Sequence, residues 1–130
     1  MRRAVTRLYS RFLSERADGE VTDAALLVLV VLDKQDRMSL TDLAQTARVT
    51  LGSMSQTVRR LQQFGHVTKT RGTQDRRKVL FSLTEQGKAA VTASRRHRAD
   101  WLNRQLAELT PTERDDVARA AAILLRIAQS

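Results

Sequence analysis

The side chains best suited to binding chemistry are concentrated in one stretch of the sequence, residues 48–78. This stretch carries eight basic residues and one acidic residue, a balance of +7, whereas the rest of the chain carries 15 basic and 13 acidic residues, a balance of +2. Because each neutralised phosphate releases counterions, such a concentration favours binding to nucleic acid. The net charge of +9 alone leaves open a basic surface that only keeps the protein soluble.

Three polar residues within this stretch have the spacing of one helical face. Ser53, Gln56 and Arg60 lie three to four positions apart, so on a helix they point the same way. The apolar residues of the same segment are spaced to point inward: Met54, Val58 and Leu61. Glutamine pairs bidentately with adenine, and arginine with guanine or phosphate. We therefore expect this polar face to contact DNA, the alternative being an ordinary polar helix surface.

Other kinds of site lack the residues they need. The chain has no cysteine, which excludes disulfides, cysteine-bound zinc and thiol redox sensing. Its two histidines, His66 and His97, are isolated from clustered carboxylates, so we expect structural or surface roles for them. We find no nucleophile–base–acid set, no phosphate-binding glycine loop and no metal-ligand spacing. We therefore expect no enzyme activity, cofactor or metal.

The elements that must position these residues follow from apolar periodicity and capping residues. We predict helices over about 3–16, 23–35, 40–47, 51–64 and 85–109 and from 111 onward, with the first helix stopped at Asp18–Gly19. Thr22, Ser39, Thr50 and Thr110 are the predicted N-caps. Pro111 takes the first helical position after Thr110, and Glu113 completes a capping box with Thr110. The helix over 23–35 is apolar nearly all round and should be the central buried element.

One hairpin is predicted between the fourth and fifth helices. Strands over about 66–71 and 78–83 flank the turn composition Gly72-Thr73-Gln74-Asp75, and Val79, Phe81 and Leu83 alternate toward one side. Around this basic tip we expect Lys69, Arg71, Arg76 and Lys78 to contact phosphates, which position a protein without reading sequence. A second basic run, Arg95–Arg98, wraps around its helix, so we expect a solvated face or intersubunit salt bridges there.

Length and hydropathy point to a single domain in the cytoplasm. The 130 residues fit one domain. The longest apolar run, 24–32, is far shorter than the roughly 20 residues that span a bilayer, and the first residues lack the apolar stretch of a signal peptide. We expect no membrane partner.

Five short segments together resemble the MarR family of bacterial regulators. They are Ser39-Leu40-Thr41-Asp42-Leu43-Ala44, the run 49–65 with its closing Gly65, Asp75-Arg76-Arg77, Leu83-Thr84-Glu85-Gln86-Gly87 and Leu109-Thr110-Pro111-Thr112-Glu113-Arg114. The match spans about residue 22 to the C-terminus. As departures, the recognition helix has Gly52, and Leu51 and Gln56 occupy places where family members often carry polar or basic residues.

The resemblance implies a mainly α (α+β) winged helix-turn-helix fold in the order ααααββαα. It implies one domain, 1–130, with a DNA-binding lobe at 20–87 and dimerisation helices at 1–17 and 88–130. The implied function is a homodimeric transcriptional regulator, expected to be a repressor, that binds a pseudo-palindromic operator in double-stranded DNA. Its half-sites would be about one helical turn apart.

The resemblance also assigns residue roles. Arg77 is implied as the residue of the wing at the minor groove, where a narrow groove attracts arginine. Asp75 is expected to hold the turn or to orient that guanidinium. Thr50 and Ser39 are expected first as caps and second as phosphate contacts. A small-molecule effector of unknown identity is implied as well, with Tyr9, Phe12 and Trp101 as candidate lining residues or plain core.

The terminal segments carry more apolar residues than a small domain easily covers: Val5, Leu8, Phe12, Leu109, Val117, Leu124 and Ile127. By the resemblance they interdigitate across a two-fold axis. Two alternatives stay open: a winged-helix interaction module that has lost specific base readout, which Leu51 and Gly52 favour, and, more remotely, a double-stranded RNA binder.

Overall fold

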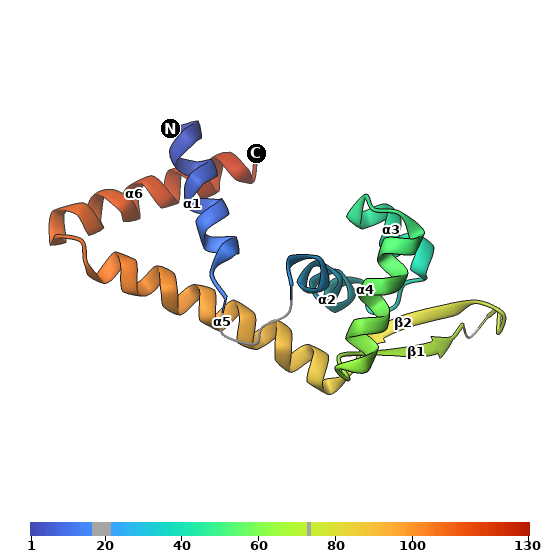
Figure 1. Cartoon of the computed structure of the whole chain (residues 1–130). Helices are drawn as coiled ribbons and strands as arrows, with labels where there is room; N and C mark the ends of the chain where they lie inside the picture. The colour runs from blue at the N-terminus through green and yellow to red at the C-terminus, as the bar shows by residue number, and fades with distance from the viewer. Residues whose placement is uncertain (17–21, 73) are drawn as a thin grey trace. The chain divides into compact units, whose positions relative to one another are not determined.

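The computed structural model describes residues 1–16, 22–72 and 74–130, which form six helices and one two-stranded antiparallel sheet (Figure 1). In chain order these are α1 (Arg2–Ser14), α2 (Asp23–Gln35), α3 (Leu40–Ala47), α4 (Leu51–Gln63), β1 (Val67–Arg71), β2 (Val79–Leu83), α5 (Glu85–Ala107) and α6 (Pro111–Ala128). The mainly helical class and the order ααααββαα are confirmed. Asp18 and Gly19, the expected end of the first helix, lie outside the described residues.

The predicted N-caps explain where four helices begin. The hydroxyl of Thr22 accepts from Ala25 N–H at 3.3 Å, and that of Ser39 accepts from Asp42 N–H at 3.1 Å. Thr50 caps α4 in the same way, and Thr110 and Glu113 form the reciprocal capping box of α6. These caps satisfy backbone donors that a helix leaves open in its first turn, so the local sequence is sufficient to set these boundaries.

The chain divides into two compact units, which we call the core unit (Ala17–Arg96) and the terminal unit (Met1–Arg16 with His97–Ser130). In the core unit, α2 contributes more of the buried apolar side chains than any other described element, and it contacts α3, α4 and β2. Leu29 and Leu61 are fully buried, and Phe81 and Val91 close the same cluster from β2 and α5. The expectation that residues 23–35 form the central element is confirmed.

The hairpin pairs Val67 with Leu83 and Arg71 with Val79. Val67 and Phe81 are buried in the core. Val79, expected on the same side of the strand as Phe81, is about one-third exposed, because it pairs with Arg71 next to the turn, where the hairpin extends beyond the core. The base of the hairpin is therefore fixed and its tip projects from the core unit (Figure 1).

The segment 83–87 fastens three elements together where α5 begins. Thr84 Oγ1 donates to the carbonyl of Gly65, just after α4, and accepts from Gly87 N–H at 3.0 Å. A Cβ at position 87 would collide with the carbonyl of His66, so only glycine allows this close approach. Gly65 itself has a left-handed φ of 79°, as expected of a residue that ends a helix. Together these contacts hold α4 and the hairpin in one arrangement.

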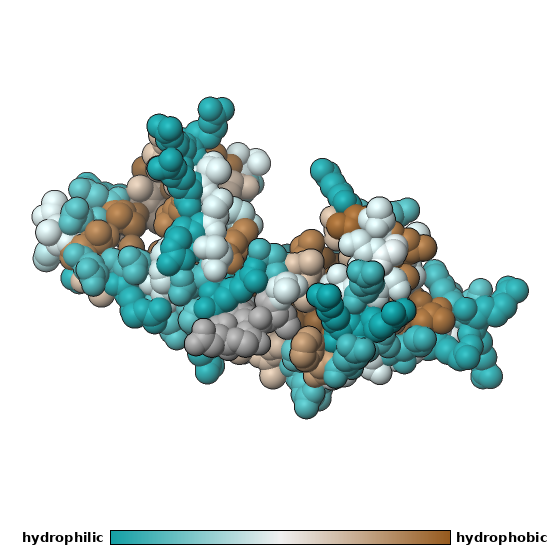
Figure 2. All heavy atoms as spheres, viewed as in Figure 1, coloured by the Kyte–Doolittle hydropathy of each residue, from teal (hydrophilic) through white to brown (hydrophobic). Residues whose placement is uncertain are grey.

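The terminal unit has little interior of its own. Trp101 is its buried apolar residue among the described positions; the ring contacts Phe12 at 6.5 Å between centroids, and the guanidinium of Arg11 lies 4.8 Å above it. Tyr9, by contrast, is exposed. Most of the apolar side chains of α1 and α6 are also exposed, and Figure 2 shows hydrophobic surface over α6.

The side chains of the basic run 95–98 are exposed only in part, which differs from the solvated face that we expected. Arg95 is exposed and pairs with Asp33 at 3.3 Å. Arg98 is 6% exposed and donates to the carbonyl of Leu13 at 3.2 Å, so a solvated position is wrong for this residue because α1 covers it. His97 lies 3.4 Å from the carboxylate of Glu15. A hydrogen bond from Arg11, with a smaller contribution from His97, lowers the pKa of Glu15.

Candidate nucleic-acid interface

The tight turn between α3 and α4 sets the direction of α4. Arg48 ends α3 in the left-handed conformation, with φ 57° and ψ 45°, and its N–H reaches back to the carbonyls of Ala44 and Gln45. Two residues later the hydroxyl of Thr50 accepts from Ser53 N–H at 3.1 Å and starts α4. The two helices pack directly against each other. This helix–turn–helix places the second helix on the surface of the core unit.

The inward and outward faces of α4 separate as predicted. Met54, Val58 and Leu61 are buried. Ser53, Gln56 and Arg60 are all exposed, so the structure brings these three predicted side chains together on the outer face of one helix. Gly52 lies on the same face, four residues before Gln56.

The hairpin tip is held by its own acidic residue. Asp75 Oδ1 accepts from the backbone N–H of Arg77 at 3.0 Å and lies 3.4 Å from Arg77 Nε. Asp75 therefore holds the turn and orients the guanidinium at once. The Arg77 side chain is 93% exposed. Arg71 donates to the carbonyl of Arg76 at 3.0 Å, which ties the end of β1 to the tip.

A groove of about 330 Å³ separates α4 from the hairpin. Its apolar lining residues are Leu40, Val58, Val79 and Phe81, and its polar lining residues are Ser55, Arg59, Gln62 and Lys69. Lys69 was predicted as a phosphate contact, but Arg59 was not, although it belongs to the same basic stretch. Its position opposite the hairpin depends on tertiary structure, and only its charge signalled it in the sequence.

The remaining predicted residues differ in exposure. Thr50 is exposed while it caps α4, whereas Ser39 is half-buried beneath its cap bond. Arg76 is fully on the surface of the tip. The cap roles of Ser39 and Thr50 are confirmed, and their contacts with phosphate stay a prediction.

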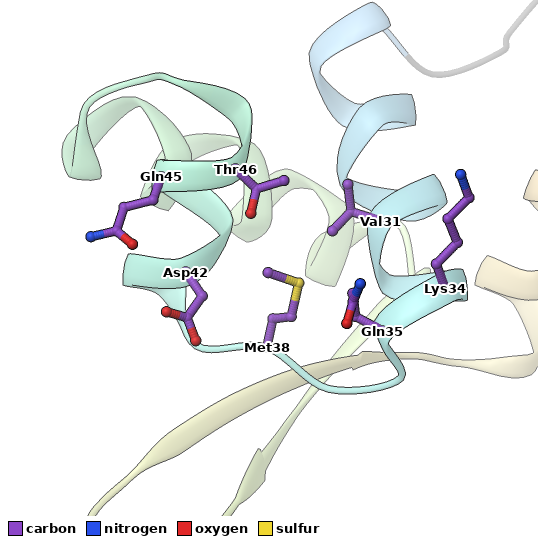
Figure 3. Close-up of a pocket in the computed structure, with 7 residues that line it drawn as sticks. All are labelled: Val31, Lys34, Gln35, Met38, Asp42, Gln45 and Thr46. Carbon is purple, nitrogen blue, oxygen red and sulfur yellow. The ribbon is translucent and has the colours of Figure 1, made fainter. Parts of the chain in front are cut away.

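A second hollow of about 500 Å³ lies between α2 and α3 (Figure 3). Met38 sits between the two helices, with Val31 and Thr46 on either side. The charged residues of its lining, Lys34 and Asp42, have opposite signs, and Met38 packs against the core. The hollow is thus a crease beside the core, without the concentration of positive charge found around α4.

A metal site and a membrane-spanning helix each require a particular grouping of residues. The described part of the chain contains no group of three or more histidine, aspartate or glutamate side chains that could hold a metal ion. No helix within the described ranges combines the length and apolar character needed to cross a membrane.

Comparison with known proteins agrees with this geometry. The sequence model of the MarR family matches residues 21–79. An HTH-type transcriptional regulator of Mycobacterium bovis, Mb0904, is 33% identical over 124 residues, which cover 95% of this chain and 87% of that protein.

Two solved structures have the same fold. The YusO protein from Bacillus subtilis is 26% identical with a TM-score of 0.76, covering 99% of this chain and 92% of that one. The F27L mutant of MepR from S. aureus, bound to an oligodeoxyribonucleotide, is 19% identical with a TM-score of 0.74, covering 98% of each chain. The chain belongs to the MarR family of DNA-binding, helix-turn-helix transcriptional regulators.

Proposed function

We propose that the chain binds a specific sequence of double-stranded DNA as a homodimer and represses transcription from a pseudo-palindromic operator. In this proposal α4 enters the major groove and the hairpin tip reaches the minor groove. The observation that carries it is the shared exposure, on one unit, of the polar face of α4 and of Arg77 at the hairpin tip. The solved complex of MepR with an oligodeoxyribonucleotide supports this use of the fold.

The polar face of α4 supplies the base readout. The major groove is about 12 Å wide and admits a helix, and its base edges differ in donors and acceptors. Gln56 would pair with adenine, Arg60 with guanine or a phosphate, and Ser53 with either kind of base edge. Because Met54 and Val58 are buried on the opposite side, the polar side chains meet DNA from a fixed helix.

The hairpin and the helix-capping residues position the protein on the DNA. Arg77 would insert into the minor groove, where narrow stretches carry an enhanced negative potential. Asp75 reduces the freedom of that side chain before DNA arrives, because it already bonds both the backbone and Nε of Arg77. The residues assigned to phosphates are Lys69, Arg71, Arg76, Ser39 and Thr50, with Arg59 added from the groove.

The terminal unit provides the surface that binds a second copy of the chain. Exposed apolar side chains on α1 and α6, such as Leu8 and Ile127, gain stability when a partner chain removes them from water. A two-fold axis through such an interface repeats the DNA-binding surface, so a symmetric operator follows from a symmetric dimer. A repressor of this kind acts on the chromosome, so we also infer a cytoplasmic location. The proposal assigns no reaction to the chain, and a small-molecule effector stays a prediction.

Selection of bound duplexes from a random pool tests the proposal. We expect a palindromic motif with half-sites about one helical turn apart, bound far more tightly than random DNA of equal length at two salt concentrations. Equal affinity for selected and random duplexes would instead support the interaction module that lacks base readout. A preference for double-stranded RNA over DNA would support the remote third alternative.

A further inference from the structure

The N-terminal end of α4 is apolar, whereas the outer face of the helix, with Ser53, Gln56 and Arg60, is polar. Leu51 is 53% exposed and Val49, just before the cap residue, is 41% exposed. Single exposed apolar residues are common on protein surfaces. Here two of them flank the start of the helix that carries the proposed base contacts, and the next residue is a glycine.

The fold gives no reason for Gly52. Its φ is not positive, since Gly65 is the positive-φ glycine of the described residues, and a Cβ at position 52 would meet nothing within 4 Å. At Gly65 and Gly87, by contrast, a Cβ would clash with neighbouring atoms. Glycine inside a helix is less stable than alanine. The chain thus keeps a destabilising residue at a place where its own structure would accept alanine.

The position of Gly52 indicates what would need the space. It lies on the exposed face of α4 with Ser53 and Gln56, and recognition helices contact base edges with their N-terminal residues. Without a Cβ, the backbone of this turn can come closer to a base edge. The bulky apolar group that a major groove presents is the C5 methyl of thymine.

We propose that Leu51 and Gly52 read a thymine methyl group in each half-site of the operator. Gly52 leaves room for the methyl-bearing base edge, and the exposed Leu51 side chain packs against the methyl. The inference rests on the proposed function, because it needs α4 in the major groove. It reverses the expectation that Leu51 and Gly52 weaken base readout: the readout at this turn is apolar.

Replacing thymine by deoxyuridine in the selected operator tests the contact, because this change removes the methyl and leaves the base pair unchanged. Replacement at this position in one half-site should weaken binding about fourfold, and replacement in both half-sites about 15-fold, as expected for one buried methyl each. The Leu51→Ala variant should bind the thymine duplex more weakly and should lose the discrimination. Leu27→Ala is the control, since Leu27 is a leucine of the core unit with a similar exposure of 43%.

The Gly52→Ala variant tests whether the missing side chain at position 52 leaves room for the base edge. It should raise the Tm by about 3–5 °C, because alanine favours the helix, yet weaken operator binding about tenfold. Its affinity for random DNA should not change. A protein that becomes more stable and binds its operator less tightly cannot be explained by misfolding.

The outcomes separate this inference from the proposed function. Operator binding that is insensitive to every thymine-to-uridine change, or a Leu51→Ala variant that still discriminates, would overturn the methyl contact and leave the proposed function intact. A Gly52→Ala variant with unchanged operator affinity would overturn the role of the glycine. Failure to select any motif would overturn both proposals.

Discussion

The core unit and the terminal unit bury their apolar side chains to very different extents. In the core unit, helices α2, α3 and α4 and the hairpin enclose a shared interior, and Leu29 is 0% exposed. In the terminal unit, Leu125 is 62% exposed and Ile127 61% exposed on α6. Both units are built from well-formed helices, so helix formation alone does not explain the difference.

This difference shows that local helix-capping signals and burial of apolar side chains are separate requirements for a stable helix. The capping box of α6 sets the start of that helix without any tertiary contact, but most helical stability comes from packing an apolar face. The core unit satisfies both requirements within one chain. The terminal unit has the local helix signals, and the proposed second chain would bury its apolar face.

The largest expected effect is in the core unit. Leu29→Ala should lower the free energy of unfolding by about 2–5 kcal/mol, because it leaves a cavity in a closed interior. Urea denaturation followed by circular dichroism measures it. An effect below about 1 kcal/mol would mean that the core unit is more loosely packed than described.

The next largest effect is expected when a charged residue is introduced into the exposed apolar surface of the terminal unit. Leu125→Glu should lower the dimer association constant at least about 100-fold, because each chain would place a carboxylate in an apolar interface. Light scattering after size-exclusion chromatography at micromolar concentration measures this. The matched control is Leu27→Glu, on an exposed position of the core unit, which should remain dimeric. A monomeric unmodified protein, or a dimeric Leu125→Glu variant, would contradict the comparison.

A smaller effect is expected at the hairpin tip, and it should leave assembly unchanged. Arg77→Ala should weaken operator binding about tenfold and reduce the slope of log affinity against log salt by about one. Fluorescence anisotropy at several salt concentrations measures both quantities. Lys88→Ala is the control, because Lys88 is a basic residue of α5 whose partner is Glu85 at 3.7 Å. Unchanged affinity and slope for Arg77→Ala would reject its contact with DNA.

The smallest effect is a pH dependence of α6. Hydrogen bonds from the backbone and hydroxyl groups of Thr110 lower the pKa of Glu113 below its ordinary value of 4.5. The ionised carboxylate therefore stabilises the folded state above about pH 4.5, and this contribution is lost as pH falls through the lower folded pKa. Glu113→Gln keeps a capping side chain without the charge, so its Tm should approach that of the unmodified protein between pH 6 and pH 3.

Asp115→Asn provides the comparison for this measurement, since it removes one charge from the same helix outside the capping box. A Tm difference between the Glu113→Gln variant and the unmodified protein that does not shrink on acidification would contradict the assigned role of Glu113.

Features set by neighbours in the chain could be predicted from the sequence. The caps Thr22, Ser39, Thr50 and Thr110 each bond a backbone group three residues away, so their chemistry is visible locally. The separation of Ser53, Gln56 and Arg60 from the buried residues of α4 follows from helical spacing alone.

Features set by distant segments could not be predicted. The need for glycine at position 87 depends on the carbonyl of His66 across the β1–β2 hairpin. Arg98 is covered by α1, 85 positions earlier in the chain, and Arg59 lines a groove only because the hairpin lies opposite it. Gly52 is the reverse case, because its surroundings within the chain are empty and its explanation is sought in DNA.

A titration with spacing variants of the selected operator tests the central claim most directly. Insertion of five base pairs between the half-sites moves them to opposite sides of the duplex, whereas ten base pairs restore their orientation. If two copies hold their α4 helices and hairpins at a fixed separation along one face of the DNA, the five-base-pair insertion should cost about 100-fold in affinity, the advantage of binding both half-sites together. Equal affinity for the original and the five-base-pair variant would contradict the account.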